Sequence, residues 1–201
     1  MSDVLASAWQ ALCASSPWEL AAMLLSVAYL VLAVRQSIWC WAAAFFGTAI
    51  YTAVFLNARL YMDSGLQVFY MLMAVYGWRQ WRHHRDPGED LQITVRPARW
   101  HLLVIAVVLA AAALSGAILE EFTSAAFPYL DSLTTWASVI TTWMVARKIL
   151  ENWVYWIVID SVSIYVYLDR ALYLTVFLFL LYTVIAVFGW QQWQKNRLEG
   201  Q

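Results

Sequence analysis

The sequence predicts an all-α membrane protein in which seven transmembrane helices form a 3+1+3 arrangement. Three observations predict this class: the composition, the spacing of the apolar segments, and an internal repeat. Of 201 residues, 63% are hydrophobic and only 12% are charged, whereas soluble domains are about 45–50% apolar and about 25% charged. Too few polar residues remain to cover a water-soluble surface. The formal net charge of −1 also excludes a strongly basic nucleic-acid-binding surface, so we expect a lipid bilayer as partner and no nucleic acid.

The apolar segments are close to the roughly 20 residues that an α-helix needs to cross a bilayer. The seven segments are 18–34, 38–57, 60–78, 101–119, 130–146, 150–168 and 171–190. Most breaks between them are short and polar, which forces neighbouring helices to be antiparallel. The break at 79–100 is longer and contains Pro87-Gly88, so it indicates an aqueous loop. Because no basic residue precedes the first segment, we interpret it as a retained helix and not as a signal peptide.

The lysines and arginines predict the orientation in the membrane. Ten of the 12 follow the first, third, fifth and seventh segments, and only Arg59 and Arg170 fall on the other side. Since positive residues concentrate in cytoplasmic loops, the C-terminus and the long loop should be cytoplasmic and the N-terminus outside. We therefore expect a multi-pass protein of a bacterial inner membrane.

An internal repeat divides the chain. The sequence YGWRQW at 76–81 recurs as FGWQQW at 188–193, and we call this shift of 112 the repeat offset. The same offset aligns Arg35 with Arg147 and Trp41 with Trp153. The expected divisions are an extracytoplasmic segment 1–17, a first three-helix repeat 18–81, a cytoplasmic loop 82–99, a linker helix 100–120, a second three-helix repeat 130–193 and a cytoplasmic tail 194–201.

The number of helices between equivalent positions determines how the repeats are oriented. Equivalent helices are four spans apart, an even number, so the two repeats should be parallel, as in SWEET transporters. Transporters of this architecture hold their substrate between the halves near mid-membrane. The alternative is an old duplication that serves only structure.

Polar residues within the predicted spans are candidates for a binding site, because ionisable groups are costly in hydrocarbon. In span 150–168, Trp153, Trp156, Asp160 and Ser163 share one helical face. Two indoles and a carboxylate on one face could hold a flat cationic ring by stacking, cation–π attraction and charge compensation. Alternatively, the tryptophans form an interface belt and Asp160 bonds to a neighbouring helix.

Two further spans carry polar stripes. The stripe in span 130–146 consists of Asp131, Thr134, Thr135, Ser138 and Thr142. It could bind a hydroxylated solute, or it could join helices within the membrane. In span 60–78, Asp63, Gln67 and Tyr70 share a face, and Gln67 lies about two turns in, where an unpaired amide is costly. The alternative role for Asp63 is to cap the start of the helix.

Other site classes lack the necessary residues. Cys13 and Cys40 fall on opposite predicted membrane faces, so we expect neither a disulfide nor a metal site. The three histidines lie in or beside the cytoplasmic loop, and Ser64 and Ser115 have no histidine partner in any span. There is no Walker loop. We therefore expect no enzyme activity, cofactor or metal.

Several stretches resemble the PnuC family of bacterial vitamin transporters across nearly the whole chain. The matching stretches are Leu66-Gln67-Val68, Tyr76-Gly77-Trp78, Asp131-Ser132, Arg147-Lys148 and the segment ENWVYWIVI at 151–159. The resemblance implies facilitated diffusion of an unphosphorylated vitamin, most often nicotinamide riboside, made one-way by a separate cytoplasmic kinase. It also implies a substrate site that includes Gln67, Trp153, Trp156 and Asp160.

One position departs from the family pattern. Family members that carry nicotinamide riboside have Asn where this chain has Asp160. An acid there, together with Thr134-Thr135-Trp136, resembles the thiamine-carrying PnuT branch. Nicotinamide riboside is therefore the family default and thiamine a near-equal competitor. A scaffold without a substrate is the alternative from another class, and a homo-oligomer is compatible with either.

Overall fold

The computed structural model describes residues 2–57, 61–83, 91–123 and 127–199, which form eight helices. The helices are α1 (Ser2–Ala14), α2 (Pro17–Val34), α3 (Trp39–Asn57), α4 (Tyr61–His83), α5 (Ala98–Phe122), α6 (Pro128–Ala146), α7 (Asn152–Asp169) and α8 (Tyr173–Glu199). Arg59 and Arg85, which entered the charge count, lie outside the described residues, as does the side chain of Asp63.

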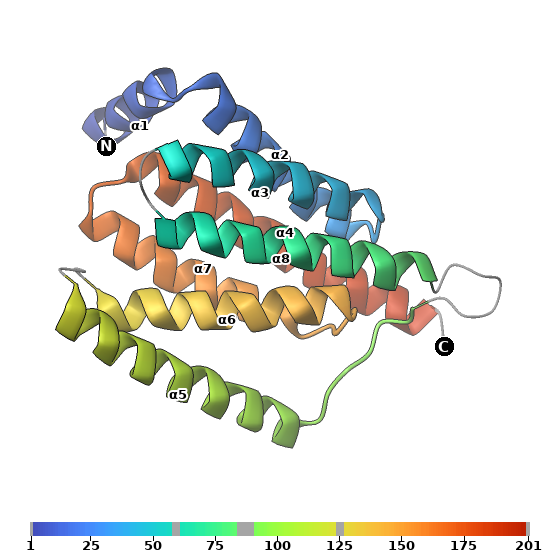
Figure 1. The fold of residues 1–201 in the computed structure, drawn as a ribbon. Helices are drawn as coiled ribbons and strands as arrows, with labels where there is room; N and C mark the ends of the chain where they lie inside the picture. The colour runs from blue at the N-terminus through green and yellow to red at the C-terminus, as the bar shows by residue number, and fades with distance from the viewer. Residues whose placement is uncertain (1, 58–60, 84–90, 124–126, 200–201) are drawn as a thin grey trace.

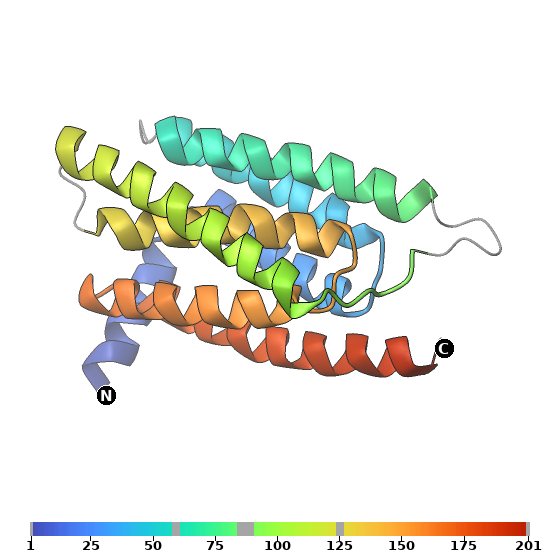
Figure 2. The same cartoon turned by 90° about the horizontal axis from the view of Figure 1, so that it is seen from below.

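The helices α2 to α8 correspond one to one with the predicted apolar segments, and α1 is an additional helix that the sequence analysis did not predict. By length and composition, α2, α3, α5 and α8 are long and apolar enough to cross a membrane. The more polar α4, α6 and α7 run beside them along the bundle (Figures 1 and 2). That these three helices also cross the membrane stays a prediction.

Six helices form a closed ring. Helices α2, α3 and α4 pack in chain order, as do α6, α7 and α8, and the two groups meet where α2 packs on α8 and where α4 packs on α6. Helix α5 packs outside the ring against α6, and α1 packs against α8 at the end opposite the C-terminus (Figure 1). The repeat offset takes α2 to α6 and α4 to α8. The α2–α8 interface and the α6–α4 interface are therefore equivalent.

Helices α2 and α6 end in the same turn at equivalent positions of the repeat. Helix α2 is followed by Gln36 with φ 54°, and α6 is followed by Lys148, the equivalent position in the second repeat, with φ 49°. The amide of Ser37 donates to Leu32 O and that of Ile149 donates to Met144 O, each at 2.9 Å. This is the Schellman pattern, in which a left-handed residue ends the helix and satisfies its last carbonyls. The repeat in sequence is therefore a repeat in backbone geometry at this point.

Beside these turns, four tryptophans form what we call the tryptophan cluster: Trp41, Trp81, Trp153 and Trp193. Trp41 packs edge-on against Trp81 with ring centroids 5.5 Å apart, and Trp153 packs edge-on against Trp193 at 5.4 Å. The two pairs are again related by the repeat offset, and Trp81 and Trp193 join them at 6.3 Å. Their exposed fractions are 6% or less, so the cluster is a buried core at this end of the bundle.

Glycines make room for two of these rings. A Cβ atom at Gly77 would overlap the Trp41 ring, and one at Gly189 would overlap the Trp153 ring. These glycines belong to the GW motifs that identified the repeat. A glycine is therefore required at each position because an indole lies directly against the helix backbone.

The segment before α5 is docked on the protein, although the sequence predicted an aqueous loop through residue 99. Thr94 N donates to Lys148 O at 3.0 Å, Leu150 N donates to Thr94 O at 2.9 Å, and Arg96 N donates to the Glu151 carboxylate at 3.1 Å. In the first turn of α5, His101 adds a contact with α7, because its Nδ1 lies 3.0 Å from the Tyr155 hydroxyl. Residues 91–97 thus attach the start of α5 to the turn between α6 and α7.

The glycine contacts predict a stability difference within one helix. Gly77→Ala should lower the free energy of unfolding by about 1–3 kcal/mol, the usual cost of overpacking a core. Gly65→Ala, also in α4, is the control because nothing lies within 4 Å of its added Cβ, and higher helix propensity should make it neutral or slightly stabilising. Thermal unfolding of the detergent-solubilised protein measures both. Equal midpoints for the two variants would contradict the contact with Trp41.

Candidate functional site

A cavity of about 760 Å³ lies within the ring of six helices. All six contribute to its lining, whereas α1 and α5 do not. Its polar lining residues are Ser15, Glu19, Ser26, Tyr29, Thr48, Tyr51, Gln67, Tyr70, Asp131, Thr134, Thr135, Ser138, Thr142, Trp156, Asp160, Ser163, Tyr167, Arg170, Thr175 and Tyr182. A cavity of this size holds a small organic molecule, and its many hydroxyl groups can hydrogen-bond a polar one.

The cavity brings together most of the residues that the sequence analysis singled out. The predicted site residues in its lining are Gln67, Tyr70, Asp131, Thr135, Trp156, Asp160 and Ser163. Trp153 is not among them: its side chain is 1% exposed and packs against Gly189 and Trp193 in the tryptophan cluster. Helical spacing places Trp153 on the same face as Trp156, but about one turn closer to the start of α7. At that position Trp153 lies outside the lining of the cavity.

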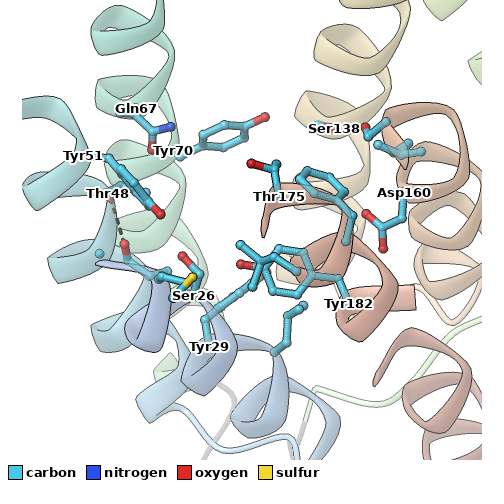
Figure 3. A pocket seen from close by; sticks show the side chains of 18 of the residues that line it. Ser26, Tyr29, Thr48, Tyr51, Gln67, Tyr70, Ser138, Asp160, Thr175 and Tyr182 are labelled. Carbon is cyan, nitrogen blue, oxygen red and sulfur yellow. Dashed lines mark hydrogen bonds between the residues drawn. The ribbon is translucent and has the colours of Figure 1, made fainter. Parts of the chain in front are cut away.

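Asp160 lies in the middle of α7, is 3% exposed and faces the cavity (Figure 3). Among the lining residues that the structure describes, Arg170 is the only basic one. It lies at the end of α7, where its Nη2 is 3.4 Å from Asp131 Oδ2. Since an ionised carboxylate in a bundle interior is costly without a positive partner, Asp160 makes the middle of the cavity suited to a cation.

The lining also follows the repeat offset. The equivalent positions that both line the cavity include Glu19 and Asp131, Ser26 and Ser138, Thr48 and Asp160, Tyr51 and Ser163, Gln67 and Phe179, and Tyr70 and Tyr182. Figure 3 shows several of these side chains around one space. The positions are equivalent but the chemistry is not, because the carboxylate of Asp160 has a threonine as its counterpart.

Several lining residues were missed by sequence reasoning. Ser26 and Tyr182 had a usable signal, since they are the offset partners of Ser138 and Tyr70. Tyr51 had the same signal as the offset partner of Ser163, whereas Tyr29 had none, because a tyrosine in an apolar segment looks like any other large apolar residue. Figure 3 shows Tyr29, Tyr51 and Tyr182 directed into the space opposite or beside Asp160. Much of the aromatic surface of the cavity is therefore tyrosine.

The two ends of the cavity differ. At one end the lining reaches the ion pair of Asp131 and Arg170, whose side chains are 42% and 36% exposed. At the other end the lining stops at residues such as Trp41 and Ala186, and the rest of the tryptophan cluster lies beyond them. The cavity is thus closed at the end where α2 and α6 finish.

Apolar helices arranged around a polar cavity are the architecture expected of a membrane transport protein for a small solute. The family model described as nicotinamide mononucleotide transporter matches residues 16–195. The chain belongs to this family, the PnuC family that its motifs predicted, which consists of transporters and not enzymes. It is accordingly a multi-pass protein of the inner membrane.

Individual relatives cover most of the chain at low identity. The riboflavin/roseoflavin transporter RibM of Streptomyces davaonensis is 26% identical over 176 residues, covering 85% of this chain and 81% of the relative. The nicotinamide riboside transporter PnuC of Escherichia coli is 23% identical over 183 residues, covering 77% of each chain. The crystal structure of the vitamin B3 transporter PnuC superposes with a TM-score of 0.74 at 19% identity, covering 92% of this chain and 83% of that one. The fold is therefore shared with that solved transporter.

The lining predicts which positions of α6 water can reach. In a background lacking Cys13, a cysteine replacing Ser138, which lines the cavity, should react with a small water-soluble thiol reagent. A cysteine replacing Ser132 should not, because Ser132 is 4% exposed and lies outside the lining. Equal reaction at both positions, or at neither, would contradict a water-accessible cavity.

Proposed function

We propose that this protein mediates facilitated diffusion of an unphosphorylated cationic vitamin across the inner membrane, with nicotinamide riboside as the family default. The observation that carries the proposal is Asp160, a buried carboxylate that faces the cavity and has no basic partner among the described lining residues. A substrate cation would compensate this charge. A separate cytoplasmic kinase would then trap the vitamin and make net uptake one-way.

The proposed carrier has two parallel three-helix repeats, 18–81 and 130–193, joined by α5. The equivalence of the α2–α8 and α4–α6 interfaces supports this arrangement, as does the pairing of cavity residues at the repeat offset. Parallel repeats of this kind, as in SWEET transporters, move against each other around a central site. The cavity between the groups is then the position of the substrate.

The proposed orientation puts the C-terminus in the cytoplasm and the N-terminus outside. Helices α2, α4, α6 and α8 finish at one end of the bundle (Figure 1). The basic residues described at or near this end include Arg35, Arg79, Arg147, Lys148 and Arg197, which the positive-inside rule places in the cytoplasm. The end of the cavity with Asp131 and Arg170 then faces outward, and the tryptophan cluster faces the cytoplasm.

Within the cavity, each group has a distinct proposed role. Asp160 balances the positive charge of the vitamin ring, and Trp156 with Tyr182 provides aromatic surface beside it. Gln67 and the hydroxyls of α3 and α6 hydrogen-bond the polar remainder of the molecule. Trp153 is assigned to the tryptophan cluster and not to the substrate.

Thiamine is the second candidate, and Asp160 is again the reason. Both vitamins carry a fixed positive charge, on a pyridinium ring in nicotinamide riboside and on a thiazolium ring in thiamine. The resemblance to the thiamine-carrying branch rests on an acid at this position. Riboflavin, after which the relative RibM is named, has a neutral ring system and would gain nothing from the carboxylate.

The role of Asp160 can be tested by titrating purified protein with nicotinamide riboside, its uncharged 1,4-dihydro form, and thiamine. Asp160→Asn should weaken binding of the preferred cation by roughly 10- to 100-fold, the size of an interaction with a charged group. The 1,4-dihydro form should bind both proteins similarly. Asp131→Asn is the matched control, because Arg170 already neutralises that carboxylate, and its effect should be smaller. Equal losses for the charged and uncharged ligands would refute the charge-pairing role.

Passive transport makes a separate prediction. In liposomes containing the protein, labelled vitamin should equilibrate to the same concentration inside and outside, with or without a proton or sodium gradient. Concentration above the outside level under a gradient would refute facilitated diffusion. If Asp160→Leu and Gln67→Leu leave cellular function intact while no vitamin moves, the scaffold alternative is correct.

A further inference from the structure

We propose that Trp81 and Trp193, which occupy equivalent positions of the repeat, form the cytoplasmic gate of this carrier through two hydrogen bonds that must break before the cavity opens at that end. The inference rests on the proposed function, since a gate has meaning only if the two helix groups move against each other. Three observations support the inference: the geometry of the two bonds, the helix-end carbonyls that accept them, and the place of the tryptophan cluster at the closed end of the cavity.

The two bonds join the helix groups at both of their interfaces. Trp81 Nε1 of α4 donates to Ala146 O of α6 at 3.2 Å. Trp193 Nε1 of α8 donates to Ala33 O of α2 at 3.0 Å. In each bond, the indole belongs to one helix group and the carbonyl belongs to the other, so each group donates once and accepts once. Because both bonds cross from one group to the other, separation of the groups at this end breaks both.

The receiving carbonyls belong to the last turns of α2 and α6. Carbonyls in the last turn of a helix lack the usual partner four residues on, and a carbonyl can accept two bonds, so Ala33 O accepts from the indole in addition to the Gln36 amide of the turn. The turns at Gln36 and Lys148 direct the chain away at this point. Both indoles therefore bond to backbone at the helix end, where a modest tilt of the helix changes the distance most.

The gate lies directly beyond the cavity. The lining includes Trp41 of the tryptophan cluster, but neither Trp81 nor Trp193. Trp81 is 6% exposed and Trp193 is fully buried. Lys148 adds a further connection across the same interface, with its Nζ 5.0 Å from the centroid of the Trp81 ring. A solute in the cavity is thus separated from this end of the protein by the tryptophan cluster.

The chain contains a native reporter of the gate. Cys40, at the start of α3, is fully buried in the same hydrophobic cluster as Trp81 and Trp193. Cys13 is exposed, but it lies in α1 at the opposite end of the bundle and can be replaced by serine. Opening of the gate should expose Cys40 to a membrane-impermeant maleimide added to inside-out vesicles.

The decisive comparison is between tryptophans with and without a bond between the groups. Trp81→Phe and Trp193→Phe remove the indole N–H, and each should speed modification of Cys40 by roughly two- to tenfold, the population change expected from one hydrogen bond. Trp153→Phe is the matched control: Trp153 is equally buried and packs against Trp193, but its N–H has no partner among the described residues. It should change the rate much less. No increase in the first two variants, or an equal increase in the control, overturns the proposal.

A second pair of variants avoids the buried core, in case the phenylalanine variants do not fold. Lys148→Asn removes the ammonium from the Trp81 ring while keeping a residue type that tolerates positive φ. Gln36→Asn, at the equivalent turn, is its control. A faster reaction of Cys40 in Lys148→Asn alone supports the gate, and equal rates in the two variants overturn it. Neither assay requires a vitamin, so failure of vitamin transport and failure of the gate give distinguishable results.

Discussion

A buried carboxylate in the middle of a helix constrains the arrangement of its neighbours in a membrane protein. Lipid offers Asp160 no hydrogen bonds and no counter-charge, so α7 must turn this face away from lipid, toward groups that can tolerate it. The hydroxyls of α6 and the tyrosines around the cavity provide such surroundings. Polar stripes on α4, α6 and α7 lower the apolarity of these helices, and most of their described residues line the cavity. The same residues that weaken the membrane signal therefore build the site.

The sequence predicted helices and helical faces well, because both depend on local periodicity. The seven helices α2 to α8 and most of the residues that line the cavity on α4, α6 and α7 followed from runs of apolar residues and from spacings of three or four. It could not predict how far the cavity extends along a face, and this is why Trp153 was placed beside the substrate with Trp156. The docking of Thr94 on the α6–α7 turn and the pairing of Arg170 with Asp131 depend on contacts between distant residues. No local pattern reports such contacts.

The internal repeat supplied the long-range information that local patterns lack. Its clearest positions, the GW motifs and Trp41 with Trp153, turn out to be packing positions in which a glycine admits an indole. Cavity positions also recur at the same offset, but only some of them keep their residue: Tyr70 matches Tyr182, whereas Thr48 is the counterpart of Asp160. Packing requires the same shapes in both groups, whereas a site for an asymmetric molecule benefits from different chemistry on its two sides. The scaffold has therefore kept a symmetry that the cavity has lost in part.

The proposed passive mechanism also limits how strongly the closed end of the protein can be held. A hydrogen bond contributes about 1 kcal/mol net, so the bonds of Trp81 and Trp193 together favour closure by only a few kcal/mol. A solute can shift the balance between two conformations by no more than its difference in affinity for them, and a vitamin-sized ligand can supply a difference of that order. A large, purely apolar interface between the groups would cost far more to open. Trp81 and Trp193, with one hydrogen bond each and packed edge-on against Trp41 and Trp153, exclude solutes while keeping the energy of opening within reach of the substrate.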